Sequence, residues 1–237
     1  MRKPFRFKQF EVHQDRCAMK VGTDGVLLGA WTPLDRQPKN ILDIGAGTGL
    51  IALMLAQRSL AETIDAIEIE EAAYEQCVEN FEASPWADRL FCYHAGLDEM
   101  AEELEDPYEL IVSNPPFYKS GSESGDKARD RARQNSALPF GELLFYVDQL
   151  LSPNGFFCSI IPCQEEAGFL DLARGFNLYP FKITRVKGNF ESEVKRSLLV
   201  FSRTNQACEE ELLVIEKQRH VYTEAYKELC RDFYLKL

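Results

Sequence analysis

The sequence predicts a doubly wound α/β fold, in which helices cover both faces of an open and mostly parallel sheet. Three observations predict it. An apolar strand at 41–44 runs into a glycine-rich turn and a helix, a second strand ends in an acid, and strand and helix patterns alternate to residue 202. We expect seven strands, the last of them antiparallel, because the segment before it is short enough for a hairpin.

Composition favours a single domain over residues 1–237, because 237 residues with 45% hydrophobic content can bury one sizeable core. No apolar run is long enough to span a bilayer, and the N-terminus has no signal-like apolar region, so no membrane partner is expected. The seven cysteines form no C-x-x-C pair and indicate reduced thiols of a cytoplasmic protein. The three histidines are scattered, so we expect no metal site.

The net charge of −11 argues by itself against a nucleic-acid partner. The charges are unevenly distributed, however. Basic residues gather in 1–20 and 182–203, whereas residues 62–110 are strongly acidic. A bipolar surface and a surface of dispersed, solvated charges both remain open.

Residues 1–35 are expected to form an N-terminal extension of the domain. Partial alternation of apolar residues in 5–12 and 18–21, on either side of a turn at Gln14-Asp15, predicts a hairpin. Thr23 or Asp24 is a plausible N-cap for the short helix that follows.

Period-two patterns predict the remaining strands, and period-3.6 patterns predict the helices. The predicted strands cover 64–70, 90–95, 108–113, 156–161, 178–186 and 196–202. One predicted helix starts at Leu50, and the other predicted helices cover 74–81, 143–151, 164–175 and 222–233.

The turn after the first strand of the sheet has Gly45, Gly47 and Gly49 at G-x-G-x-G spacing. Glycines let the backbone pass close to a ligand that a Cβ atom would block, and the helix start adds free N–H donors. The spacing is not the dinucleotide G-x-G-x-x-G, and no Lys-Ser/Thr follows as in a P-loop. We place the three glycines, with Asp43 at the end of the strand, in a cofactor site; a turn without a ligand is the alternative.

Glu68 lies at the end of the next strand, within the separation of about 20 residues that is typical of a ribose-binding carboxylate. A carboxylate at this position can accept hydrogen bonds from both ribose hydroxyls. The alternative is a solvated charge at a strand end.

The run Asn114-Pro115-Pro116-Phe117 follows a strand at the edge of the sheet where ligands bind. Asn114 can accept a hydrogen bond from an exocyclic amine, and Pro115 can do so through a main-chain carbonyl that Pro116 holds in place. Phe117 offers a ring face for base stacking. Because two acceptors on one planar amine draw its lone pair out of conjugation, we expect these four residues to be catalytic. A Pro-rich loop is the alternative.

Three segments resemble, in their order along the chain, the motifs of class I S-adenosylmethionine-dependent methyltransferases that act on amino groups: ILDIGAGTG, AIEIE and NPPF. The enzymes of this class have a Rossmann-like fold. Two further segments, at the start and the end of the chain, resemble a bacterial family that methylates N6 of adenine 37, next to the anticodon, in valine tRNA. They are FRFKQFEVHQDRCAMKVGTDGVLLGAW and YTEAYKELCRDFYLKL. The resemblance covers essentially the whole chain. It implies a tRNA partner whose target base is flipped out of its stack.

The resemblance also implies roles for single residues. The three glycines would approach the methionine part of S-adenosylmethionine, and Glu68 would hold its ribose. Asp98 would sit near its adenine, although the sequence HAGLDEM displaces this acid from the family pattern. Lys20 and Thr23 would lie by the cofactor entrance.

A polar and then basic segment follows Phe117, and its cations are the RNA-binding residues that we expect. They are Lys119, Lys127, Arg129, Arg131 and Arg133, helped by Arg2, Lys3, Arg6 and Lys8. The oligomeric state is left open.

Other functions remain open. NPPF-type loops also occur in rRNA guanine-N2 methyltransferases, and NPPY occurs in enzymes that methylate a glutamine side chain. A non-catalytic RNA-binding or partner-binding relative would keep the fold. A nicotinamide-dependent oxidoreductase conflicts with the glycine spacing.

Overall fold

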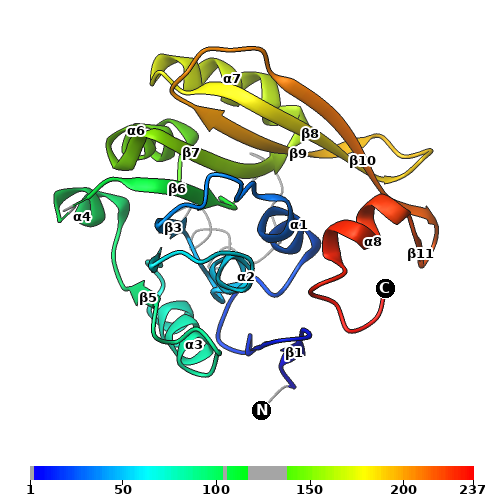
Figure 1. Ribbon diagram of the computed structural model, residues 1–237, viewed down its shortest axis with the longest axis horizontal. Helices are drawn as coiled ribbons and strands as arrows, with labels where there is room; N and C mark the ends of the chain where they lie inside the picture. The colour runs from blue at the N-terminus through cyan, green and yellow to red at the C-terminus, as the bar shows by residue number, and fades with distance from the viewer. Residues whose placement is uncertain (1–2, 104–105, 117–137) are drawn as a thin grey trace, which may run out of the picture.

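The computed structural model describes residues 3–103, 106–116 and 138–237 (Figure 1). Phe117, Arg2 and the predicted RNA-binding cations at 119–133 lie outside the described residues. The protein has an α/β architecture, with helices on both faces of a mixed and mostly parallel sheet, and the predicted fold class is confirmed.

A nine-stranded sheet forms the middle layer. In spatial order its strands are β11 (Val221–Tyr222), β10 (Glu209–Gln218), β8 (Tyr179–Asn189), β9 (Val194–Ser202), β7 (Leu151–Pro162), β6 (Tyr108–Ser113), β3 (Asn40–Ile44), β4 (Thr63–Ile67) and β5 (Leu90–Tyr93).

Two of these strands, β10 and β11, were not predicted. The seven predicted strands correspond to β3–β9, and β9 is antiparallel to both of its neighbours, as expected for the second arm of a hairpin. β10 pairs in parallel with β8, and β11 pairs antiparallel with β10. Because β10 lies near the edge of the sheet, only Leu213 of its ten residues is buried, and its sequence EEELLVIEKQ shows no clear alternation.

Two helical layers cover the sheet, each over its own apolar core (Figure 1). One layer contains α1 (Thr23–Trp31), α2 (Leu50–Arg58), α3 (Glu71–Glu82) and α8 (Glu224–Cys230). The other contains α4 (Leu97–Glu102), α6 (Phe140–Leu150) and α7 (Glu166–Gly175), the last preceded by the 3-10 turn η1 (Cys163–Glu165).

The N-terminal hairpin is smaller than predicted. β1 (Phe5–Arg6) pairs with β2 (Glu11–Val12), so the chain turns between them rather than at Gln14-Asp15, and residues 13–22 form no strand. The aromatic side chains explain this turn, because the rings of Phe7 and Phe10 stack at 4.7 Å and both are buried.

The N-cap of α1 is Gly22, and the prediction that Thr23 or Asp24 caps this helix is wrong. The carboxylate of Asp24 instead pairs with the guanidinium of Arg196 at 2.8 Å, which ties the start of α1 to β9.

Gly49 ends the glycine turn and needs to be glycine for two reasons. Its φ is +76°, and a Cβ atom on it would lie 2.5 Å from Cε1 of Phe81 and 2.8 Å from Sγ of Cys77. We expect Gly49→Ala to lower the free energy of unfolding by about 2–4 kcal/mol, from left-handed strain and overpacking together. Urea unfolding measures this change.

Gly168→Ala is the matched control, because a Cβ atom on Gly168 meets no atom within 4 Å. This residue lies within α7, where alanine is expected to be neutral or to add up to about 1 kcal/mol. A Gly49→Ala variant as stable as the wild type would contradict this account of the turn.

Candidate active site

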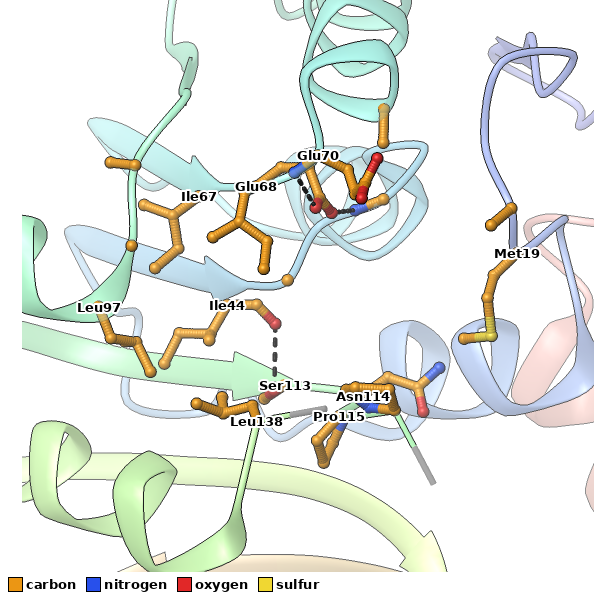
Figure 2. Close-up of a pocket in the computed structure, with 18 of the residues that line it drawn as sticks. Met19, Ile44, Ile67, Glu68, Glu70, Leu97, Ser113, Asn114, Pro115 and Leu138 are labelled. Carbon is orange, nitrogen blue, oxygen red and sulfur yellow. Dashed lines mark hydrogen bonds between the residues drawn. The ribbon is translucent and has the colours of Figure 1, made fainter. Parts of the chain in front are cut away.

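A cavity of about 450 Å³ opens at the carboxyl ends of β3, β4 and β6 (Figure 2). This volume lies within the usual range of small-molecule sites, roughly 300–1,000 Å³. Its walls come from segments 16–19, 67–70, 95–98 and 113–116, from the glycine turn and from the region where α6 starts. The predicted site residues that it brings together are Gly45, Gly47, Glu68, Asp98, Asn114, Pro115 and Pro116.

Gly45 and Gly47 form the part of the wall that is contributed by the turn. Their φ angles are +72° and +56°, and a Cβ atom on either would meet no protein atom within 4 Å. Such a Cβ would therefore project into open space, which the two glycines leave free for a ligand close to the backbone.

Glu68 is half-buried where β4 ends, and its carboxylate is held by the backbone. Its Oε2 accepts a hydrogen bond from Gly47 N at 2.8 Å, and its Oε1 accepts one from Glu70 N at 3.0 Å (Figure 2). A carboxylate oxygen can accept more than one hydrogen bond, so Glu68 can still accept from a ligand.

Asp43 lies behind the turn and does not line the cavity. It is fully buried, and its Oδ2 accepts a hydrogen bond from Ala52 N at 3.1 Å, in the first turn of α2. Burial raises the pKa of Asp43 to about 7, because the loss of water outweighs this one hydrogen bond. Its structural role is to hold the helix start beneath the glycine turn, where Gly49 also packs away from the cavity.

The raised pKa of Asp43 predicts a pH-dependent stability. The folded pKa lies above the ordinary value of 3.8, so folding takes up a proton, and this contribution to stability is lost as the pH rises through about 7. We expect Asp43→Asn to become more stable relative to the wild type between pH 5 and pH 8. Urea unfolding across this range tests it, and a stability difference that does not change with pH would contradict the assignment.

Lys20 and Thr23 are exposed and do not line the cavity. The neighbouring segment 16–19 lines the cavity instead, and contacts with α3 hold this part of the chain in place. Asn80 Oδ1 accepts from His13 N at 2.8 Å, and Asn80 Nδ2 donates to the carbonyls of His13 and Thr48. Arg16 pairs with acids of the same helix.

Asn114 extends β6 into the cavity. The preceding residue fixes the strand end, since Ser113 Oγ donates to the carbonyl of Ile44 at 3.0 Å. Asn114 Oδ1 is buried and accepts no hydrogen bond from the part of the chain that the structure describes. An unsatisfied buried acceptor costs about 1–3 kcal/mol, so a ligand N–H at this oxygen would be favourable.

The cavity also has an apolar end and an excess of negative charge. Figure 2 shows Ile44, Ile67 and Leu97 together at one end, whereas the amide of Asn114 lies toward the side of Met19. The sequence did not single out Met19 or Leu97, nor the acids Glu70 and Glu142 that join Glu68 and Asp98 in the wall. These carboxylates favour a ligand with positive charge.

Residues 24–137 match the model of the family described as "Methyltransferase small domain". A crystal structure of a predicted O-methyltransferase from Agrobacterium tumefaciens has the same fold, with a TM-score of 0.69 and 21% identity over 89% of this chain and 96% of that one. Both comparisons place the fold among those of methyltransferases. The chain is 64% identical to the tRNA1(Val) (adenine(37)-N6)-methyltransferase of Flavobacterium psychrophilum, over 98% of this chain and all of the relative. It is 46% identical to the protein of the same name from Bacteroides fragilis, over 98% of each. This chain belongs to the tRNA1(Val) (adenine(37)-N6)-methyltransferase family, which confirms the resemblance found in its sequence.

No helix among the described residues has the length and apolar character to cross a membrane. The described residues also contain no group of three or more His, Cys, Asp or Glu side chains arranged to hold a metal ion.

Proposed function

We propose that this protein transfers a methyl group from S-adenosylmethionine to N6 of adenine 37 in valine tRNA, and that it works in the cytoplasm, where this substrate is found. The full-length relatives support the substrate. One observation in the structure supports the chemistry above all others: the buried Oδ1 of Asn114, which has no hydrogen-bond partner among the described residues, lies at a cavity whose opposite wall has the glycine turn and Glu68.

The cofactor fits this cavity in shape and charge. Gly45 and Gly47 leave room for the methionine part beside the backbone, and Glu68 would accept hydrogen bonds from the ribose hydroxyls. Asp98 would lie near the adenine of the cofactor. When bound, S-adenosylmethionine supplies an electrophilic methyl group on a positively charged sulfur, which the acidic wall favours over a neutral ligand.

The target amine would be held from the β6 side. Asn114 Oδ1 and the carbonyl of Pro115 would accept its two N–H groups, which draws the nitrogen lone pair out of the ring and toward the methyl group. The base must leave the anticodon loop stack to reach this position. Stacking on Phe117 stays a prediction from the sequence, because this residue lies outside the described part of the chain.

Methyl transfer to an unmodified valine tRNA transcript, followed by mass analysis of the nucleosides, tests this function. We expect N6-methyladenosine as the product. N2-methylguanosine would instead identify a guanine-N2 methyltransferase, and methylation of a glutamine when a protein substrate is offered in place of the transcript would identify a protein methyltransferase. Binding of the cofactor and the tRNA without turnover would identify a non-catalytic relative.

A further inference from the structure

The turns that follow β8 and β10 lie at the carboxyl ends of the parallel strands, which is also the end of the sheet where the cavity opens. β6 and β7 are parallel, β9 is antiparallel to both β7 and β8, and β10 is parallel to β8, so the carboxyl ends of β6, β8 and β10 point the same way. The β8–β9 turn and the β10–β11 turn are therefore neighbours at this end of the sheet, and Figure 1 shows the two turns at the same end of the strands.

The first of these turns presents an aromatic ring to solvent. Phe190 is 62% exposed. The turn that carries it is fixed, because Asn189 Oδ1 accepts from Glu191 N and Ser192 N, and Ser192 Oγ donates to Asn189 O. Folding does not require an exposed phenylalanine here, and a ring on a fixed turn can stack on a partner with little loss of conformational freedom.

The cations of this region fall into two groups. Lys182 and Arg185 are bound to carboxylates within the sheet and the neighbouring helix, and Arg196 is bound to Asp24. By contrast, Lys187, Lys195 and Arg219 form no ion pair with any residue that the structure describes. Lys187 Nζ donates one hydrogen bond, to the carbonyl of Phe190 at 3.4 Å, but no carboxylate among the described residues neutralises its charge. The charges of the three cations closest to the two turns are thus available to an external anion.

We propose that these four residues, Phe190, Lys187, Lys195 and Arg219, form an RNA-docking edge that holds the tRNA while its target base enters the cavity. The cations would contact phosphates, and Phe190 would stack on an unpaired base or against a ribose. The inference rests on the proposed function, which supplies RNA as the partner. Unpaired cations around one exposed ring match RNA better than a protein, whose interface would need a larger apolar centre.

Two acids, Glu191 and Glu193, stand in the same turn and are exposed. They lower the local positive charge at the tip of the turn. The docking edge is therefore expected to bind phosphates through the strand ends on either side of the turn, where Lys187 and Lys195 lie, and through Arg219 on the neighbouring turn.

The test compares two double variants that change the net charge equally. Lys195→Gln/Arg219→Gln removes cations of the docking edge. Lys39→Gln/Arg174→Gln removes one Lys and one Arg at the opposite edge, because Lys39 precedes β3 and Arg174 lies near the end of α7, just before β8. The measurement is the affinity of the full chain for an unmodified valine tRNA transcript as a function of salt.

For the docking-edge variant, we expect the slope of log K against log salt to become shallower by roughly 1.4–1.8, the value for two lost phosphate contacts. The opposite-edge variant should keep the wild-type slope. Phe190→Ser should weaken tRNA binding by roughly 5- to 150-fold, the range for one lost base–aromatic stack, without a change in slope.

Equal salt slopes for the two double variants would overturn the docking edge, and so would a Phe190→Ser variant with wild-type tRNA affinity. Both results are also expected if this surface binds a protein instead of RNA. Wild-type methylation of the same transcript separates the two proposals. If the wild type methylates the transcript, a failed binding test refutes only the docking edge, whereas a wild type that binds but does not methylate it refutes the proposed function.

Discussion

Asn114→Ala is expected to lower the single-turnover rate of methyl transfer by about 10²–10³, the effect of losing one preorganised polar contact to the transition state. The structure gives the physical reason. Asn114 Oδ1 is a buried acceptor without a partner among the described residues, so a hydrogen bond from the target amine would satisfy it. Rates are measured with saturating cofactor and saturating tRNA.

Binding should change little in the same variant, because tRNA affinity depends on many phosphate contacts and the cofactor is held by the other wall. Asn154→Ala is the matched control at the opposite edge of the sheet, where Asn154 borders a separate pocket. Asn114→Asp keeps an acceptor oxygen at this position and should retain more activity than Asn114→Ala. A rate for Asn114→Ala within about threefold of the wild type, far from the expected loss, would reduce Asn114 to a structural turn residue.

Glu68→Ala is expected to weaken binding of S-adenosylmethionine by roughly 10- to 150-fold, which corresponds to about 1.5–3 kcal/mol for lost hydrogen bonds to a charged group. The structure adds a second effect that the strand-end position did not reveal. Because the Glu68 carboxylate also accepts from Gly47 N and Glu70 N, its loss should loosen the glycine turn and lower stability. Calorimetry measures the affinity, and thermal unfolding measures the stability.

Glu70→Ala provides the control for Glu68→Ala, since Glu70 is a neighbouring acid in the same cavity wall. It removes the same charge without removing the carboxylate that holds the turn. Glu68→Gln, which keeps one acceptor oxygen, should lie between Glu68→Ala and the wild type in affinity. Equal losses for Glu68→Ala and Glu70→Ala would show that the wall contributes only its total charge and that Glu68 has no specific ribose contact.

Local sequence patterns predicted the parts of the site that lie directly at strand ends. A short apolar strand followed by glycines, or by a single acid, places Gly45 and Glu68 at the carboxyl edge of a parallel sheet without any knowledge of distant contacts. Asn114 was found in the same way, because Ser113 ends a buried strand. Gly45, Glu68 and Asn114 share one property: the strand immediately before each residue fixes its place in the sheet, so a local pattern is enough to find it.

The rest of the wall depends on contacts between distant parts of the chain. Met19 reaches the cavity because Asn80 binds the backbone at His13, a contact across 67 residues that no local pattern contains. Asp43 shows the opposite error: its position at a strand end is correct, but its carboxylate turns inward to α2. β10 was missed because a strand near the sheet edge buries only one residue and leaves no alternation to detect.

The position of the transferred methyl group tests the central proposal most directly. The wild-type protein is given two unmodified valine tRNA transcripts that differ only at position 37, one with adenine and one with guanine, and the products are digested and analysed by mass. We predict N6-methyladenosine at position 37 of the first transcript and no methyl group on the second. Equal methylation of both transcripts, or methylation of a different base in the first, would contradict the proposal that N6 of adenine 37 is the target of this protein.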